Sequence, residues 1–368
     1  MNKRLLPLLL LFCLIVPTPT RAQDAPPAID WDRARSLYQR EQRGEKLSPE
    51  DQAYLDHAKV ERAKGRQGQA QRNAPPPRES TGLTPLTTAD GPAYKGFKLG
   101  LYGDGNNTPP AEHLKRAMEA AGKVQPLDAA GHPAADGRIV LMSVGMSNTT
   151  QEFSRLVQLA NADPAKNPKL VIIDSAQGGK AADSWTDKNQ PTWQEADRRL
   201  KAASVTPAQV QAIWLKQARI TPARLGEFPK HAQALEADLK NIILAAKERY
   251  PNLKLVYLSS RTYGGHAVTA LNPEPYAYES AFSVQWLIQA QIAGKDSDLG
   301  YDKAPVLLWG PYLWTDGIKG RALDSLVWNK QDTRSDGTHP SESGRQKIVE
   351  LLLTFLKTDP AAKIFFSR

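Results

Sequence analysis

From about residue 95 onward, short apolar runs alternate with amphipathic stretches. Apolar runs of this length predict strands buried on both faces, and apolar positions spaced by three to four residues predict helices. In 229–249, for example, Leu235, Leu239 and Ile242 lie on one apolar stripe. The predicted strands are RIVLMSV (138–144), KLVIIDS (169–175), VQAIWLK (210–216), LKLVYLSS (253–260) and PVLLWG (305–310). The predicted helices lie near 110–122, 150–161, 194–203, 229–249, 278–294 and 341–357.

Strands that alternate with helices predict a three-layer α/β/α domain around a mostly parallel five-stranded sheet, which we assign to 95–368. Before it, 23–64 predicts a helical hairpin, with Gly44 between the helices and Ser48 and Pro49 at the start of the second. The Gly, Gln, Pro and Ser content of 65–94 predicts an extended linker.

The first residues, 1–22, predict a secretory signal peptide. Lys3 and Arg4 precede the apolar run LLPLLLLFCLIV, and the small residue Ala22 marks the expected cleavage site. The apolar run is too short for a comfortable membrane span, so we expect a secreted or periplasmic protein without a transmembrane anchor after cleavage. The only cysteine, Cys13, lies in this segment, so the mature chain is expected to have no disulfide and no thiol nucleophile.

The net charge of +9 does not point to a nucleic-acid partner. Lysines and arginines are scattered among acidic residues, and no basic stripe with interleaved aromatic residues is present. The sequence also has no HExxH motif and no cluster of histidines and acidic residues at metal-ligand spacing, so neither a metal nor another cofactor is expected.

Polar residues gather where the predicted strands end. In parallel sheets of this type ligands bind beyond the carboxyl ends of the strands, so these residues are the candidates for function. They are Gly145-Met146-Ser147-Asn148, Gln177-Gly178-Gly179, Lys216-Gln217-Ala218, Ser259 to Gly265, and Ser335-Asp336-Gly337-Thr338-His339-Pro340.

Asp336 and His339 form the most informative pair. Three residues apart on a turn before a helix, the carboxylate can reach one imidazole nitrogen and leave the other free to act as a base. The alternatives are an ordinary turn aspartate and a histidine that caps the helix, and His266 is a rival base near another strand end. Ser147 and Asn148 are likewise compatible with an ordinary turn.

Taken together, the GMSN turn, the later Gly-Gly, the amide after the third strand and DGTHP resemble the SGNH hydrolase superfamily, which has a flavodoxin-like sheet. Over about 95–358 the chain is most similar to sialate O-acetylesterase-like carbohydrate esterases, although Met146 replaces the glutamine of their GQSN turn and WLKQA replaces their third motif. The resemblance implies that Ser147 is the nucleophile, His339 the general base and Asp336 the residue that orients His339. It also implies an oxyanion hole built from backbone N–H groups of Ser147 and of Gly178 or Gly179, with the side-chain amide of Gln217. Asn148 is a competing donor.

The resulting hypothesis is an exported serine esterase that hydrolyses O-acyl esters, O-acetyl foremost, on carbohydrates. Arg261, Tyr263 and Trp185 are candidate substrate-binding residues, because exposed rings stack on sugars and a guanidinium binds anions, although buried packing is an alternative for the rings. Two other functions stay open. One is a catalytically silent glycan-binding or scaffold protein with the same fold, and the other is an esterase for lipid, aryl or polyester substrates.

Overall fold

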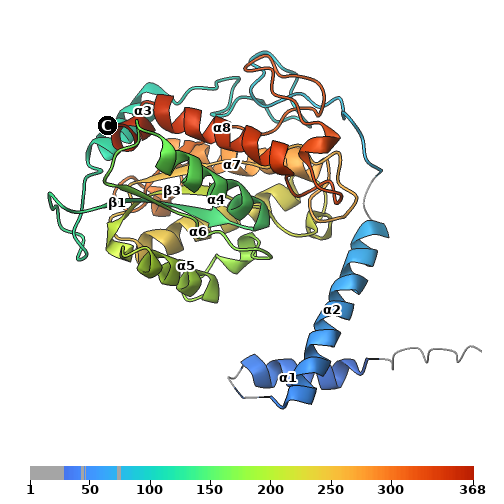
Figure 1. Ribbon diagram of the computed structural model, residues 1–368. Coiled ribbons are helices and arrows are strands. Elements are labelled where there is room, and N and C mark those ends of the chain that lie inside the picture. Colours follow the sequence, from blue (N-terminus) through green and yellow to red (C-terminus); the bar gives the residue numbers. More distant parts are fainter. Residues whose placement is uncertain (1–28, 43–44, 46, 73–75) are drawn as a thin grey trace, which may run out of the picture. The chain divides into compact units, whose positions relative to one another are not determined.

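The computed structural model describes residues 29–42, 45, 47–72 and 76–368 (Figure 1). The predicted signal peptide, with Cys13 and the cleavage site at Ala22, lies outside these residues and stays a prediction. The chain divides into two compact units, Met1–Gly65 and Arg66–Arg368, which are described separately below.

The first unit contains a pair of helices, α1 (Trp31–Gln42) and most of α2 (Pro49–Arg72). The helices bury small and aliphatic side chains between them, and an ion pair of 2.9 Å joins Lys59 Nζ to Glu41. The Ser48 hydroxyl accepts the N–H of Asp51 and so caps α2, as the sequence predicts. The helix α2 runs past the predicted end at residue 64, because no proline follows until position 75 and most residues of that stretch are good helix formers. The residues buried in this pair are Ala34, Leu37, Leu55 and Ala58.

The second unit is built on a five-stranded sheet in which every neighbouring pair is parallel and the strand order is β2-β1-β3-β4-β5. This confirms the predicted fold class. β1, β3, β4 and β5 are buried along their whole length, which explains why they read as largely apolar runs. Buried and partly buried residues alternate in the edge strand β2. Their bounds are β1 Ile139–Gly145, β2 Leu170–Ile173, β3 Val210–Lys216, β4 Leu255–Leu258 and β5 Val306–Trp309.

Helices cover both faces of this sheet. Figure 1 shows α4 and α8 along one face and α5 and α6 on the other, and α7 packs against α6. Short 3₁₀ turns occur at Ala182–Ser184, Pro207–Gln209, Pro222–Leu225, Ser297–Leu299 and Lys330–Asp332. The α-helices of this unit are α3 Ala111–Gly122, α4 Ser147–Ala162, α5 Pro191–Ala202, α6 Lys230–Arg249, α7 Tyr276–Ile292, α8 Glu342–Thr358 and α9 Ala362–Phe366.

The strand order places a switch point beside β1. The chain leaves β1 for β2 on one side and later returns to β3 on the other, so the loops after β1 and β3 diverge there and leave a crevice. Gly145, the last residue of β1, is in register with Lys216, the last residue of β3. Ser147 follows Gly145 after one residue, so it lies at this crevice.

Part of the predicted linker belongs to the second unit and is hydrogen-bonded within it. The carboxylate of Asp316 accepts the backbone N–H groups of Thr81 and Gly82 at 2.6 and 2.8 Å, and Ile318 donates its N–H to the carbonyl of Glu79. Residues 79–82 are therefore fixed on the loop after β5 by a buried carboxylate, which satisfies backbone groups that a free linker would leave to water.

Candidate active site

Ser147 is the first residue of α4, three residues before the predicted start of that helix. The N–H groups of a helix's first turn have no acceptor within the helix, so the Ser147 N–H is available to a ligand. The turn is tight: a Cβ on Gly145 would lie 2.3 Å from the Thr149 hydroxyl, which itself donates to the carbonyl of Lys216. Glycine at 145 is therefore required for the first turn of α4 to pack on the ends of β1 and β3.

A hydrogen-bonded chain links the three predicted catalytic side chains. The hydroxyl of Ser147 lies 2.7 Å from His339 Nε2, and His339 Nδ1 lies 2.5 Å from the carboxylate of Asp336. The other oxygen of Asp336 accepts the backbone N–H groups of Thr338 and His339 at 2.9 Å. Burial would raise the pKa of Asp336, but these hydrogen bonds outweigh it and lower that pKa to about 2. Asp336 is therefore a carboxylate at neutral pH and holds the imidazole with Nε2 directed at Ser147.

The loop that carries His339 is held by contacts on both sides. Gly337 adopts φ = +64°, and a Cβ there would lie only 1.8 Å from the carbonyl oxygen of His266. The carbonyl of Asp336 accepts the N–H of Val268. On the other side, the amide of Asn148 donates to the carbonyl of Thr338 at 2.8 Å. The residue after the candidate nucleophile thus anchors the loop of the candidate base.

The rival base His266 is buried, with 3% of its surface exposed. Its Nε2 lies 3.0 Å from the carbonyl oxygen of Trp328. Its ring packs edge-on against Tyr263. These contacts give His266 a structural role beside the site, and the hydrogen bond to Ser147 comes from His339 instead.

The predicted oxyanion donors differ in their exposure and in the hydrogen bonds that they already make. Gly178 and Gly179 are exposed, Gly179 has φ = +74°, and among the described residues neither N–H has an intramolecular acceptor. The Asn148 amide is already used by Thr338. Gln217 is buried, and its amide makes only a long contact of 3.4 Å to the carbonyl of Lys180. The backbone N–H groups of Ser147 and of the Gly-Gly loop are thus the freer donors.

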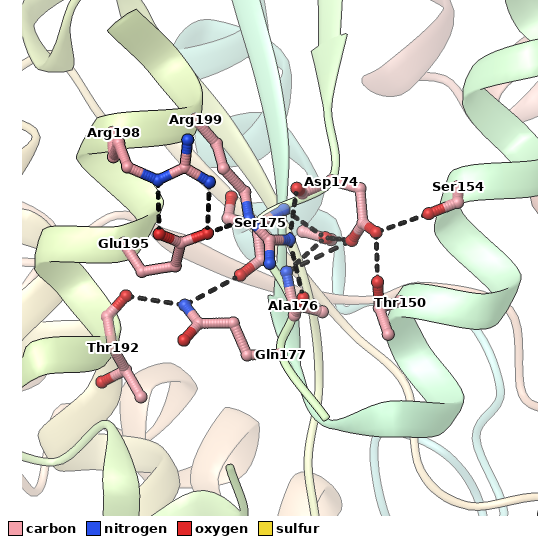
Figure 2. Close-up of polar contacts among 11 residues, drawn as sticks. Thr150, Ser154, Asp174, Ser175, Ala176, Gln177, Thr192, Glu195, Arg198 and Arg199 are labelled. Atoms are coloured by element: carbon pink, nitrogen blue, oxygen red, sulfur yellow. Dashed lines mark hydrogen bonds and ion pairs between the residues drawn. The ribbon is translucent and has the colours of Figure 1, made fainter. Parts of the chain in front are cut away.

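A polar network fixes the loop that carries Gly178 and Gly179 (Figure 2). Asp174, directly after β2, accepts hydroxyl groups of Thr150 and Ser154 on α4. The guanidinium of Arg199 on α5 donates to the carbonyls of Asp174 and Ala176, both at 3.0 Å. The loop is therefore tied both to the helix that begins with Ser147 and to the opposite layer of the domain.

Directly beneath this turn lies a buried ion pair that the sequence analysis missed. Lys216 Nζ contacts both carboxylate oxygens of Glu152 on α4 at 2.6 Å, and the two side chains are 1% and 0% exposed. Burial raises the pKa of Glu152 and lowers that of Lys216 to about 8, while each partner opposes the shift of the other. The sequence feature that could have indicated this pair is Lys216 itself, a charged residue at the end of a largely apolar strand.

A cavity of about 250 Å³ opens beside Ser147 and His339. It contains the candidate substrate residue Arg261. The other two candidates do not line it. Tyr263 is buried and donates its hydroxyl to the carbonyl of Arg78, and the Trp185 ring is buried against Trp193. The cavity is lined by Met146, Ser147, Asn148, Gly179, Arg219, Ile220, Arg261, Leu271, Asn272, Thr338 and His339.

Within the part of the chain that the structure describes, no three histidine, cysteine or acidic side chains are grouped as a metal site would need. None of its helices combines the length and apolar character that crossing a membrane requires.

No family model matches the chain, and no curated protein matches it in sequence. Among solved structures, a Bacteroides fragilis protein with a provisional acylhydrolase assignment aligns at a TM-score of 0.34 and 12% identity, over 67% of this chain and 96% of its own. A salicylyl-acyltransferase from a tetracycline biosynthetic pathway aligns at 0.34 and 15%, over 62% and 58%. An extracellular lipase from Streptomyces rimosus aligns at 0.31 and 12%, over 59% and 99%. Because these TM-scores are below 0.5, the chemistry of the site has to be judged from its own geometry.

Proposed function

We propose that the protein is an exported serine esterase that hydrolyses O-acyl esters on carbohydrates. The observation that carries the proposal is the chain of hydrogen bonds from Ser147 through His339 to Asp336, beside a cavity and next to unused backbone N–H groups. A serine hydroxyl is a weak nucleophile until a base removes its proton, and an imidazole oriented by a carboxylate can do this near neutral pH.

In the proposed mechanism, Ser147 Oγ attacks the ester carbonyl while His339 Nε2 takes its proton. The oxyanion that forms is stabilised by the N–H of Ser147 and an N–H of the Gly178-Gly179 loop, and such donors each contribute roughly 3 to 4 kcal/mol to lowering a barrier of this kind. The imidazolium then protonates the leaving alcohol, and an acyl group stays on Ser147. Water activated by His339 hydrolyses this acyl-enzyme and restores the free serine.

The proposed substrate comes from the sequence. The carbohydrate and the O-acetyl group come from the resemblance to carbohydrate esterases, and export comes from the predicted signal peptide. A lipid, aryl or polyester substrate has less support, because the sequence has no amphipathic lid or long exposed apolar segment.

The test is acid release from a panel of O-acylated sugars and polysaccharides, measured with wild type, Ser147→Ala and His339→Gln. We expect wild type to hydrolyse at least one ester and both variants to lose at least 1,000-fold in rate, roughly the scale seen when such residues are removed. His132→Gln, at a side chain that is 77% exposed, is the matched control and should keep full activity.

A second readout is covalent labelling. An organophosphonate that reacts with activated serines should add to Ser147 in wild type, as peptide mass spectrometry can show, and not in His339→Gln. Activity that survives in Ser147→Ala would contradict the mechanism. No hydrolysis and no labelling in wild type would favour a silent glycan-binding or scaffold protein instead.

A further inference from the structure

The cavity beside Ser147 contains a buried guanidinium that forms no ion pair with any described residue. Arg261 follows β4 and is 3% exposed, yet it lines the same cavity as Ser147 and His339. Its Nε has no hydrogen-bond acceptor, and no ion pair joins its guanidinium to any residue that the structure describes. A buried charge without a partner costs several kcal/mol, so such groups are normally paired or neutralised.

Each acidic group near Arg261 already serves another residue. Both oxygens of Glu152 contact Lys216 Nζ. Asp336 is occupied by His339 and by two backbone N–H groups. Glu274 accepts the backbone N–H groups of Gly264 and Tyr278 and the indole N–H of Trp314. Burial lowers the pKa of Arg261 and the charges of these three carboxylates oppose that shift, but none of the three forms an ion pair with its guanidinium.

The second arginine of the cavity shows what a paired guanidinium looks like in the same surroundings. Arg219 contacts both carboxylate oxygens of Asp238 and lies 3.5 Å from Asp183. The charge of Arg219 is therefore paired within the protein, whereas Arg261 forms no ion pair with any described residue.

We infer that Arg261 is the receptor for a carboxylate on the acyl chain of the substrate, so that the site takes short dicarboxylic half-esters such as succinyl esters. The acyl chain is the part that stays on Ser147 while the alcohol leaves to solvent, so we assign the buried side chain of Arg261 to the acyl chain. Apolar side chains of Met146, Ile220 and Leu271 line the same cavity and suit the methylene groups between ester and carboxylate. The inference rests on the proposed function and extends it beyond acetyl.

The physical reason is a charge-assisted pair. A guanidinium binds a carboxylate through two parallel hydrogen bonds, and a buried, water-poor site strengthens them. An acetyl ester has no second carboxylate, so Arg261 would form no ion pair with it. A succinyl ester supplies a carboxylate that can pair directly with the guanidinium, so its reaction should be faster at low substrate concentration.

The experiment compares two esters of methyl glucoside at O6 that differ at one end only. The succinyl ester ends in a carboxylate, and the levulinyl ester has a methyl ketone in its place. We expect wild type to show a kcat/KM ratio of roughly 10 to 100 in favour of the succinyl ester, the range for a hydrogen bond to a charged group. In Arg261→Gln the ratio should fall to about one. In the matched control Arg219→Gln the ratio should stay at the wild-type value, because that guanidinium is occupied by Asp238.

Results of two kinetic comparisons can overturn the inference. A wild-type ratio of one or below, or a ratio that Arg261→Gln leaves unchanged, would refute it. So would an acid preference that appears only when the carboxylate is on the alcohol, tested with acetylated methyl glucuronide against acetylated methyl glucoside.

A binding measurement separates this inference from the proposed function and avoids dependence on turnover. Calorimetry with Ser147→Ala compares the same succinyl and levulinyl esters, with and without the added Arg261→Gln change, and circular dichroism checks that each variant is folded. Tighter binding of the succinyl ester that is lost with Arg261→Gln supports the receptor even if no ester is hydrolysed. Equal binding of the two esters overturns it, whatever the activity. If Arg261→Gln does not fold, the ratio of the two affinities in Ser147→Ala alone decides.

Discussion

Replacing Lys216 by methionine removes one half of the buried pair beneath Ser147 and leaves Glu152 without its cation. The side chains are similar in length, so the main effect is electrostatic. A carboxylate that is 0% exposed can escape the cost of an unpaired charge by taking up a proton. The free energy of that protonation sets an upper limit on the part of the destabilisation that comes from the unpaired charge.

The limit follows from the ordinary pKa of a glutamate, 4.5. Holding this carboxyl protonated at pH 7 spans about 2.5 pH units, or ~3.4 kcal/mol, and at pH 5 only ~0.7 kcal/mol. The folded state then keeps a proton that the unfolded chain releases, so stability falls as pH rises above 4.5. The charge of Arg261 also favours the ionised form of Glu152, so the observed cost should lie below the limit.

The mirror variant, Glu152→Gln, should show the opposite pH dependence. It leaves Lys216, whose ordinary pKa is 10.5, unpaired. Keeping this amine neutral costs at most ~4.8 kcal/mol at pH 7 and ~3.4 kcal/mol at pH 8. The unfolded chain binds the extra proton here, so stability relative to wild type rises with pH.

The assay is urea unfolding followed by circular dichroism at pH 5, 7 and 8 for wild type, both single variants and the double variant Lys216→Met/Glu152→Leu. We expect the double variant to lie within about 1 kcal/mol of wild type, because an apolar pair of similar volume can replace a buried ion pair. Equal destabilisation by Lys216→Met at pH 5 and pH 7 would refute the reasoning, since no unpaired carboxylate would then be involved.

Two further predictions concern the loop that carries His339. Asp336→Asn should lower kcat by roughly 10,000-fold with little change in KM, because an amide no longer enforces the tautomer that presents Nε2 as a base; steady-state kinetics measure this, and a loss below tenfold would argue against the role of Asp336. Gly337→Ala should unfold more easily and lose activity, because its Cβ would lie 1.8 Å from the His266 carbonyl in addition to the φ = +64° strain. Gly96→Ala, with φ = +87° but no atom within 4 Å, should cost only about 1 kcal/mol in urea unfolding and keep its activity. Equal effects of the two glycine variants would contradict the steric argument.

The fold could be predicted from the sequence because β1, β3, β4 and β5 are buried along their whole length and so form largely apolar runs. A parallel sheet then brings all strand ends to one edge, which is why Ser147 and the loop of His339 could be expected to lie near each other. The start of α4 was predicted three residues late. Asn148, Thr149 and Thr150 are weak helix formers, and tertiary contacts such as the bond from Thr149 to the Lys216 carbonyl outweigh that preference.

The parts that could not be predicted depend on which side chains meet across the fold. Lys216 and Glu152 are 64 residues apart, and nothing in the local pattern of either shows that they pair. The carboxylate of Asp316 binds residues of the expected linker more than 230 positions away. Whether Arg261 forms an ion pair depends on its whole neighbourhood, and among the described residues it forms none. The burial of Tyr263 and Trp185 likewise cannot be read from their positions after strands.

The bond from Asn148 to the Thr338 carbonyl has a consequence for the order in which the protein matures. Ser147 is synthesised 192 residues before His339, and the loop that brings the imidazole into place is held partly by the side chain next to Ser147. Until the segment around Thr338 has emerged from the ribosome and docked, Ser147 lacks its base and the Asn148 amide lacks its acceptor. A chain interrupted before that point should therefore contain the candidate nucleophile in an inert form, and reactivity of Ser147 can report completion of the fold.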